Sequence, residues 1–174
     1  MKKLLLLVAL PLFAITPGHL RWAVKTASDQ GAIRIAPAVV PTTIAEMTSW
    51  PAPAAPTERL APHETTIYQV TATVIGYKIE DDGDIHVVLY DAGKMMVAEI
   101  PDVHLIRKSR FRDPIVGARA AFEARLPAPT ARLRKVSAKV RVTGVGFFDK
   151  IHGQTGAAPN GIELHPVLGI EFVQ

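Results

Sequence analysis

The sequence predicts a mostly β domain with one helix, a five-stranded Greek-key barrel over residues 63–174. Three observations predict it: segments of alternating apolar and polar residues, turn residues between them, and a single helical segment. The order is three meandering strands, the helix and then two strands, and the first strand is long and carries a glycine. This is the element order of an OB-fold, a small barrel.

The first three strands are predicted from their alternation. Residues 65–80 read TTIYQVTATVIGYKIE, a long strand in which Gly76 predicts a bulge. An acidic turn follows at residues 80–84, where Asp-Gly favours a hairpin. The second strand carries Ile85, Val87 and Leu89 on one face, and the third strand, residues 94–100, follows a turn at residues 91–93.

The helix is predicted from its capping and its spacing. Asp113 is expected as the N-cap with Pro114 in the first helical position, and Pro127 and Pro129 end the helix. A fourth strand is expected over residues 135–145. The last strand, residues 164–173, contains Pro166, which indicates an edge or a bulge.

Two segments precede the predicted barrel. Residues 1–18 carry Lys2 and Lys3 and then an apolar run that is too short to span a bilayer, the pattern of a signal peptide. We therefore expect export to the periplasm or the extracellular space. Residues 19–62 are rich in proline and are expected to form a largely irregular tether, unless Trp22 or Trp50 packs back on the domain as a strap.

Two resemblances follow from particular motifs. The pairing of DGDIH at residues 82–86 with GVGFFDKIHGQTGAAPNGIELHPVLGI at residues 144–170 resembles a group of exported bacterial proteins, which implies no activity. DGDIHVVLYDAGKMM is similar to the opening hairpin of the staphylococcal-nuclease family, itself OB-folded, which implies calcium binding at Asp82 or Asp84. The family's catalytic Arg would fall near Val97 or Ala98, and neither is basic, so this resemblance implies the fold and not the activity.

The family's remaining acidic positions are also poorly matched, because Glu99 and Asp102 are the only stand-ins for its second Asp and its catalytic Glu. In the residue pattern itself, the acidic turn lacks the length and the closing Glu of an EF-hand loop. We expect this turn to be a solvated hairpin turn.

The Gly-rich stretch, residues 144–166, holds most of the polar groups that could carry chemistry. With His86 it offers a set of imidazole and carboxylate side chains for a divalent metal. The predicted ligands are His86, Asp149, His152, Glu163 and His165. The competing interpretation is that this stretch satisfies its own backbone, as long irregular loops must. Cysteine is absent, which excludes disulfides and thiolate sites.

Charge divides the domain in two. Residues 107–141 hold 11 Lys and Arg against two acids, whereas residues 80–102 hold seven acids against Lys94. A basic surface on this fold indicates a polyanion, either an anionic cell-surface polymer or nucleic acid, and export and scarce aromatic residues disfavour nucleic acid. The alternative is a solvated basic face that pairs with the acidic hairpins. The predicted ligand-binding residues are Lys139, Arg141, Gln154 and Asn160.

Three functions are therefore open. The leading hypothesis is an exported binding module for an anionic polymer or another envelope component, with the Gly-rich stretch as its site. The second is a metal-dependent hydrolase, such as a phosphodiesterase, that uses the predicted metal ligands. The third is a structural or interaction protein of the envelope.

Overall fold

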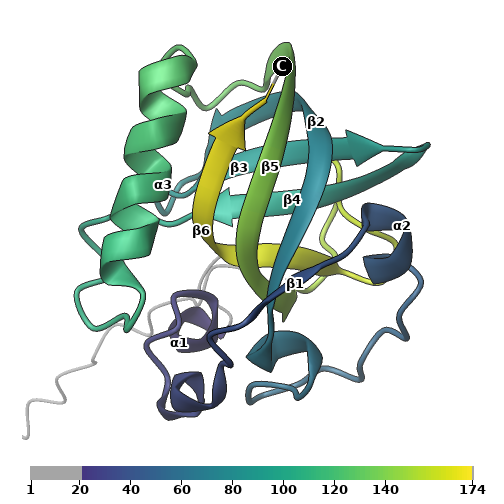
Figure 1. The fold of residues 1–174 in the computed structure, drawn as a ribbon, viewed down its shortest axis with the longest axis vertical. Helices are drawn as coiled ribbons and strands as arrows, with labels where there is room; N and C mark the ends of the chain where they lie inside the picture. The colour runs from purple at the N-terminus through teal and green to yellow at the C-terminus, as the bar shows by residue number, and fades with distance from the viewer. Residues whose placement is uncertain (1–20, 174) are drawn as a thin grey trace, which may run out of the picture.

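The computed structural model describes residues 21–173 and is mostly β with one main helix (Figure 1). In chain order the elements are α1 (Trp22–Lys25), η2 (Gln30–Arg34), β1 (Val39–Pro41), α2 (Ile44–Met47), η3 (His63–Thr65), β2 (Ile67–Ile79), β3 (Ile85–Asp91), β4 (Lys94–Ile100), α3 (Arg112–Arg125), β5 (Arg134–Phe148) and β6 (Ile162–Phe172). No helix among these residues is long and apolar enough to cross a bilayer.

The strands form one mixed sheet that curls back on itself. The order is β1-β2-β3-β4-β6-β5, and β2 also pairs with β5, so that five strands nearly close a ring. Most neighbours are antiparallel, but β4 pairs in parallel with β6, and β1 adds a short parallel strand beside β2. With α3 between β4 and β5, the architecture is OB-fold-like, as the element order predicts.

The irregularities predicted from Gly76 and Pro166 are confirmed. The register of β2 shifts between Val74 and Gly76 against both β3 and β5. The pairing of β5 with β6 shifts on both sides of Gly144, close to Pro166. A bulge bends a strand and increases its twist, which is what allows a five-strand sheet to close.

The inner face of the ring is the apolar core. Ile85, Val87 and Leu89, which the alternation places on one face, are buried there, together with Val70, Ala98 and Val142 of the neighbouring strands. The predicted helix is present as α3, which buries Ile115, Ala118 and Phe122, but the predicted cap is wrong. Phe111, and not Asp113, holds the N-cap position and makes no side-chain cap hydrogen bond. Ser109 accepts hydrogen bonds at this end of the helix: its Oγ from the N–H of Phe111 and its carbonyl oxygen from the N–H of Arg112.

Residues 21–62, named the strap below, are largely irregular as expected but pack on the barrel. Ile44 and Met47 of α2 are fully buried in the main core, and the Trp50 ring stacks on His63 at 4.1 Å. A second apolar cluster joins Ala27, Ala32 and Ile35 of the strap to Ile67 and Val145 on the outer face of the barrel. The strap is therefore a cover rather than a detached tether. The division at residue 62 stays a prediction, and residues 1–18 lie outside the described range.

Candidate functional site

Along β3, β4 and β6, polar side chains lie on the outer face of the barrel and apolar side chains lie on the inner face. Side chains alternate along a strand, so neighbours of the core residues of β3, β4 and β6 point outward. Those neighbours include His86, Glu99, Glu163 and His165, and every one is buried. They are buried because α1 and the β5–β6 loop, residues 149–161, lie over them. Together with Lys25 and Asp84 we call them the polar layer.

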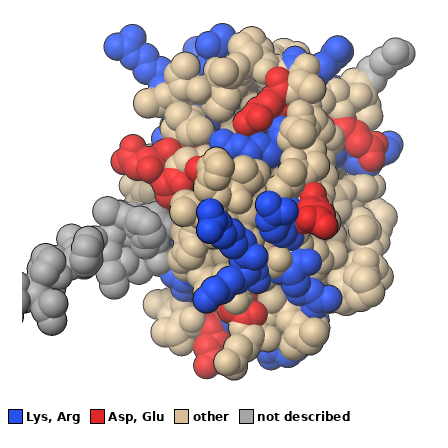
Figure 2. All heavy atoms as spheres, turned by 90° about the vertical axis from the view of Figure 1, so that its left-hand side faces the viewer, with Lys and Arg blue, Asp and Glu red and all other residues tan. Residues whose placement is uncertain are grey.

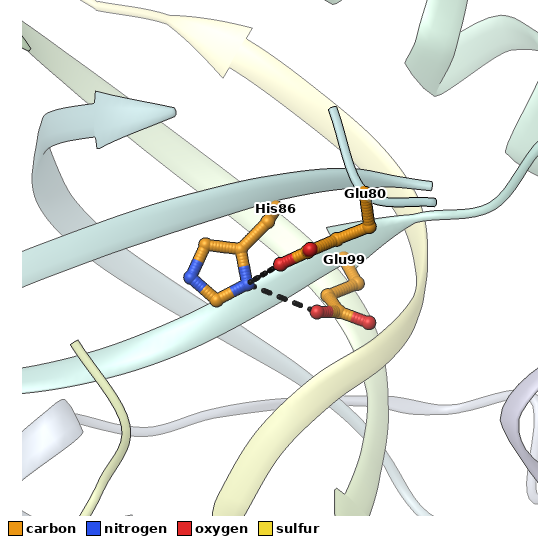
Figure 3. Close-up of side chains that lie close together, drawn as sticks. All are labelled: Glu80, His86 and Glu99. Atoms are coloured by element: carbon orange, nitrogen blue, oxygen red, sulfur yellow. Dashed lines mark hydrogen bonds and ion pairs between the residues drawn. The ribbon is translucent and has the colours of Figure 1, made fainter. Parts of the chain in front are cut away.

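Glu99 is the centre of the polar layer. His86 donates from Nδ1 to Glu99 Oε1 at 3.0 Å, and His165 Nδ1 lies 3.1 Å from Glu99 Oε2. Figure 3 shows Glu80 approaching the same His86 nitrogen, at 3.4 Å. Burial opposes ionisation of Glu99, but the hydrogen bonds from His165 and His86 dominate and hold the pKa of its carboxyl well below the usual range. One carboxylate thus orients two imidazoles.

His86 joins the barrel to the β5–β6 loop. Its Nε2 donates to the carbonyl oxygen of Thr155 at 2.8 Å. Burial disfavours the charged ring, but the hydrogen bonds to Glu99 and Thr155 outweigh burial and raise the pKa of His86. Gly156 lies so close to β3 that a Cβ there would meet Val88 at 2.4 Å. The loop is therefore seated tightly on the outer face.

His165 faces three carboxylates. Besides Glu99, its Nδ1 lies 3.3 Å from Glu163 Oε1, and its Nε2 lies 3.4 Å from Asp84 Oδ2. The last two atoms make no hydrogen bond with each other or with any other described residue. Burial opposes the imidazolium, but Asp84, Glu163 and Glu99 raise the pKa of His165 well above its ordinary value.

Lys25 of the strap supplies the cation that closes the polar layer. Its Nζ lies 3.6 Å from Glu99 Oε2, 3.7 Å from Asp149 Oδ2 and above the Phe147 ring. Burial disfavours its charge, but the surrounding carboxylates, Glu163 first, outweigh that and raise the pKa of Lys25. Burial, reinforced by the charge of Glu99, raises the pKa of Glu163 to about 7.

The predicted metal ligands are only partly brought together. His86, His165 and Glu163 lie around Glu99, and Asp149 joins them through Lys25. His152 does not join them, because its side chain is 41% exposed and its nearest carboxylate oxygen, on Asp149, is 3.9 Å away. The polar layer also contains Lys25, Asp84 and Glu99, which are not among the five predicted ligands, although the nuclease resemblance implies calcium binding at Asp82 or Asp84 and makes Glu99 an acidic stand-in. Asp84 is fully buried, so the expectation of a solvated acidic turn is wrong for this residue.

The predicted ligand-binding residues do not form one site. Asn160 is buried and donates to the carbonyl oxygens of Met47 and Trp50, so it fastens α2 to the loop. Gln154 bonds only to the backbone of its own loop, at Lys150 and His152. Lys139 and Arg141 are exposed on β5, before the Gly-rich stretch begins. The two amides are therefore structural in this conformation, whereas the two cations belong to the basic surface.

The enclosure of the polar layer limits its chemistry. His86 and His165 are 0% exposed. A general base must come within hydrogen-bonding distance of the proton that it removes. A substrate reaches neither imidazole in this conformation unless the strap or the β5–β6 loop moves.

Comparison with known proteins yields structural likeness only. No family model and no curated protein matches the chain. An asparaginyl-tRNA synthetase of Entamoeba histolytica matches 79% of the chain at 11% identity with a TM-score of 0.44, and its complex with asparaginyl-adenylate matches at 13% with a TM-score of 0.42. A chain described as an aspartyl-tRNA synthetase of Leishmania major matches 80% at 13% with a TM-score of 0.42. The chain spans 21–24% of the length of these chains.

Proposed function

We propose that the chain is a binding module for an anionic polymer and that its site is the exposed basic surface over α3 and β5. The observation that carries this proposal is the gathering of Lys and Arg side chains on one face of the molecule (Figure 2). Exposed cations in this part of the chain are Arg107, Lys108, Arg110, Arg112, Arg125, Arg132, Arg134, Lys135, Lys139 and Arg141.

Acidic residues neutralise only part of this surface, through the pairs Arg112–Asp113, Arg119–Glu123 and Arg141–Glu171. Three carboxylates of residues 80–102 are engaged elsewhere: Glu99 and Asp84 belong to the polar layer, and Glu80 pairs with Lys78 and His86. Among the described residues, no ion pair joins an acid of residues 80–102 to a cation of residues 107–141. Arg119 donates to the carbonyl oxygens of Gly83 and Pro101 in the acidic half. The other cations of the basic face make no ion pair with the acids there, so most of the surface charge remains for a ligand.

The basic surface has few aromatic platforms for stacking bases. The aromatic residues of the sequence that could serve as such platforms are Tyr77, Tyr90 and Phe111. Tyr77 is fully buried against Phe122, Phe111 packs on the second apolar cluster, and Tyr90 is 42% exposed at the tip of the β3–β4 hairpin. Binding to single strands normally combines a basic groove with such platforms. We therefore expect the polymer to be recognised by its negative charge and not by stacking of bases.

The test measures retention on a heparin column. The wild-type domain is expected to be retained at physiological ionic strength and to elute with added salt, because each ionic contact releases counterions. A variant with Arg134 and Lys135 both changed to Gln is expected to elute at lower salt. Its matched control changes Lys94 and Lys150, exposed lysines outside residues 107–141, to Gln and is expected to elute like the wild type.

Elution of the wild type in the flow-through would refute the proposal and leave the envelope structural role as the better hypothesis. Equal shifts for the two variants would also count against it, because retention would then report net charge and not this surface.

A further inference from the structure

Two buried atoms of the polar layer face each other with no hydrogen bond. They are His165 Nε2 and Asp84 Oδ2, both on fully buried side chains and 3.4 Å apart. The two atoms lie within ion-pair distance, but neither makes a hydrogen bond. A buried polar atom that makes none costs roughly 1–3 kcal/mol, so such atoms in a native protein call for an explanation. We propose that these two atoms are ligands of a divalent metal ion of the zinc class.

The spacing of the two atoms fits this ion. Zinc binds imidazole nitrogen and carboxylate oxygen at about 2.0–2.2 Å in tetrahedral geometry, which places neighbouring ligand atoms roughly 3.3–3.5 Å apart. The measured 3.4 Å lies in that range. An ion between His165 and Asp84 therefore needs no large movement of either side chain.

Both ligands are already oriented by their other atoms. Glu99 and Glu163 hold His165 Nδ1, and Asp84 Oδ1 accepts a hydrogen bond from the backbone N–H of Asp102 at 2.8 Å. Metal-binding imidazoles normally donate their second ring nitrogen to a carboxylate or a carbonyl, which fixes the ring with its free nitrogen toward the metal. His165 has this arrangement.

Glu99 lies close enough to be a third ligand, since Asp84, Glu99 and His165 each offer a ligand atom within 4.8 Å of the others. Binding the ion would take Glu99 Oε2 away from His165 Nδ1, which Glu163 Oε1 still holds at 3.3 Å. The carboxyl groups of Asp84, Glu99, Glu163 and Asp149 all act on the Lys25 ammonium, so this layer is rich in acidic groups. Because the site is enclosed, a bound ion would act as a structural centre that joins the acidic turn to β6.

His86 shows why the site is placed at His165. Glu80, His86 and Glu99 also lie close enough to surround an ion (Figure 3). Both ring nitrogens of His86 are already used, however, Nδ1 by Glu99 and Nε2 by Thr155. The proposed site also differs in its ion from the calcium site that the nuclease resemblance implies at Asp82 or Asp84. Calcium takes oxygen ligands, whereas His165 offers an imidazole nitrogen.

This inference does not depend on polyanion binding, and its test uses the metal alone. The full domain is dialysed against a chelator and titrated with Zn²⁺ by calorimetry. The wild type is expected to bind one ion per chain with a rise in melting temperature. Asp84→Asn is expected to bind at least roughly tenfold more weakly. His152→Ala, which removes the exposed imidazole, is expected to bind like the wild type.

A measurement on the wild type alone guards against a variant that fails to fold. Long-range proton–nitrogen NMR correlations of the imidazoles are expected to show a zinc-induced shift at His165 Nε2 and none at His152. Absence of stoichiometric binding by the wild type would overturn the proposal. So would a folded Asp84→Asn domain with unchanged affinity, or a zinc-induced shift confined to another histidine.

Discussion

The two faces of the barrel are both buried, but different parts of the chain bury them. The inner face of β3, β4 and β6 is closed by the ring of strands itself and is apolar, with Leu89 and Ile100 fully buried. The outer face of the same strands is closed by the strap and the β5–β6 loop and is ionic. One face is stabilised by removing apolar area from water, and the other by pairing charges that would be costly if left single.

One alternation of apolar and polar residues along a strand is therefore compatible with burial of both faces, an apolar one and an ionic one. The pattern fixes which residues share a face, but whether the polar face meets water depends on distant segments of the chain. The following predictions test how separately the two faces contribute to stability.

The largest effect is expected from Lys25→Met, which removes the ammonium from the polar layer. Because Lys25 is 3% exposed among carboxylates, its loss leaves buried negative charge uncompensated. We expect the free energy of unfolding to fall by about 3–5 kcal/mol, measured by urea denaturation. Lys150→Met is the control: Lys150 is exposed and the change is expected to cost at most about 0.5 kcal/mol. Equal losses of unfolding free energy for the two variants would show that Lys25 does not compensate the carboxylates of the polar layer.

The inner face is tested by Leu89→Ala. The side chain is 0% exposed in the main core, so the truncation leaves a cavity. We expect a loss of about 2–5 kcal/mol in the same measurement. Combined with Lys25→Met, the loss should be additive if the two faces are independent. A double variant that departs from the sum by more than about 0.5 kcal/mol would contradict that independence.

The seating of the β5–β6 loop is tested by a pair of glycines. Gly153 and Gly156 both have positive φ, 91° and 84°, so alanine costs about 1–2 kcal/mol at either position. At Gly156 the added Cβ also meets Val88 at 2.4 Å, whereas at Gly153 nothing lies within 4 Å. We expect Gly156→Ala to cost about 1–3 kcal/mol more than Gly153→Ala. Equal costs would mean that the loop does not rest on β3 in solution.

The smallest effect is expected in the pH dependence of stability that is linked to His63, whose ring stacks on Trp50 of the strap. Burial lowers the pKa of His63, with Glu64 opposing the shift. A folded pKa below the unfolded value of about 6.5 gives stability that is present above that pH and lost as the pH falls through the folded pKa. The stability advantage of the wild type over His63→Phe should therefore shrink between about pH 7.5 and pH 5. An advantage that stays constant, or grows in acid, would show that protonation of His63 is not linked to folding.

The sequence predicts much of the fold because its inner face follows local rules. Alternation places Ile85, Val87 and Leu89 in the core, and the register shift at Gly76 follows from the glycine itself. Alternation cannot separate a covered polar residue from a solvated one, so Asp84 and Glu99 were not predicted as partners of His165. The sequence does contain a signal for the contact between His86 and Glu99, because the two-residue turn at Ala92 and Gly93 sets the register that pairs them. Lys25 had no such signal, since its partners come from distant parts of the chain.

The strap also has a consequence for the order of assembly. The hydrogen bond from Arg21 to the carbonyl of Phe148 joins residues 127 positions apart, and Lys25 meets its partners on β4 and in the β5–β6 loop. During synthesis this segment emerges before any of them. It can dock only when those partners have also left the ribosome, so the strap is made before the barrel strands but finds its place after them. Ile44 and Met47, which end in the core, are likewise made before the strands that cover them.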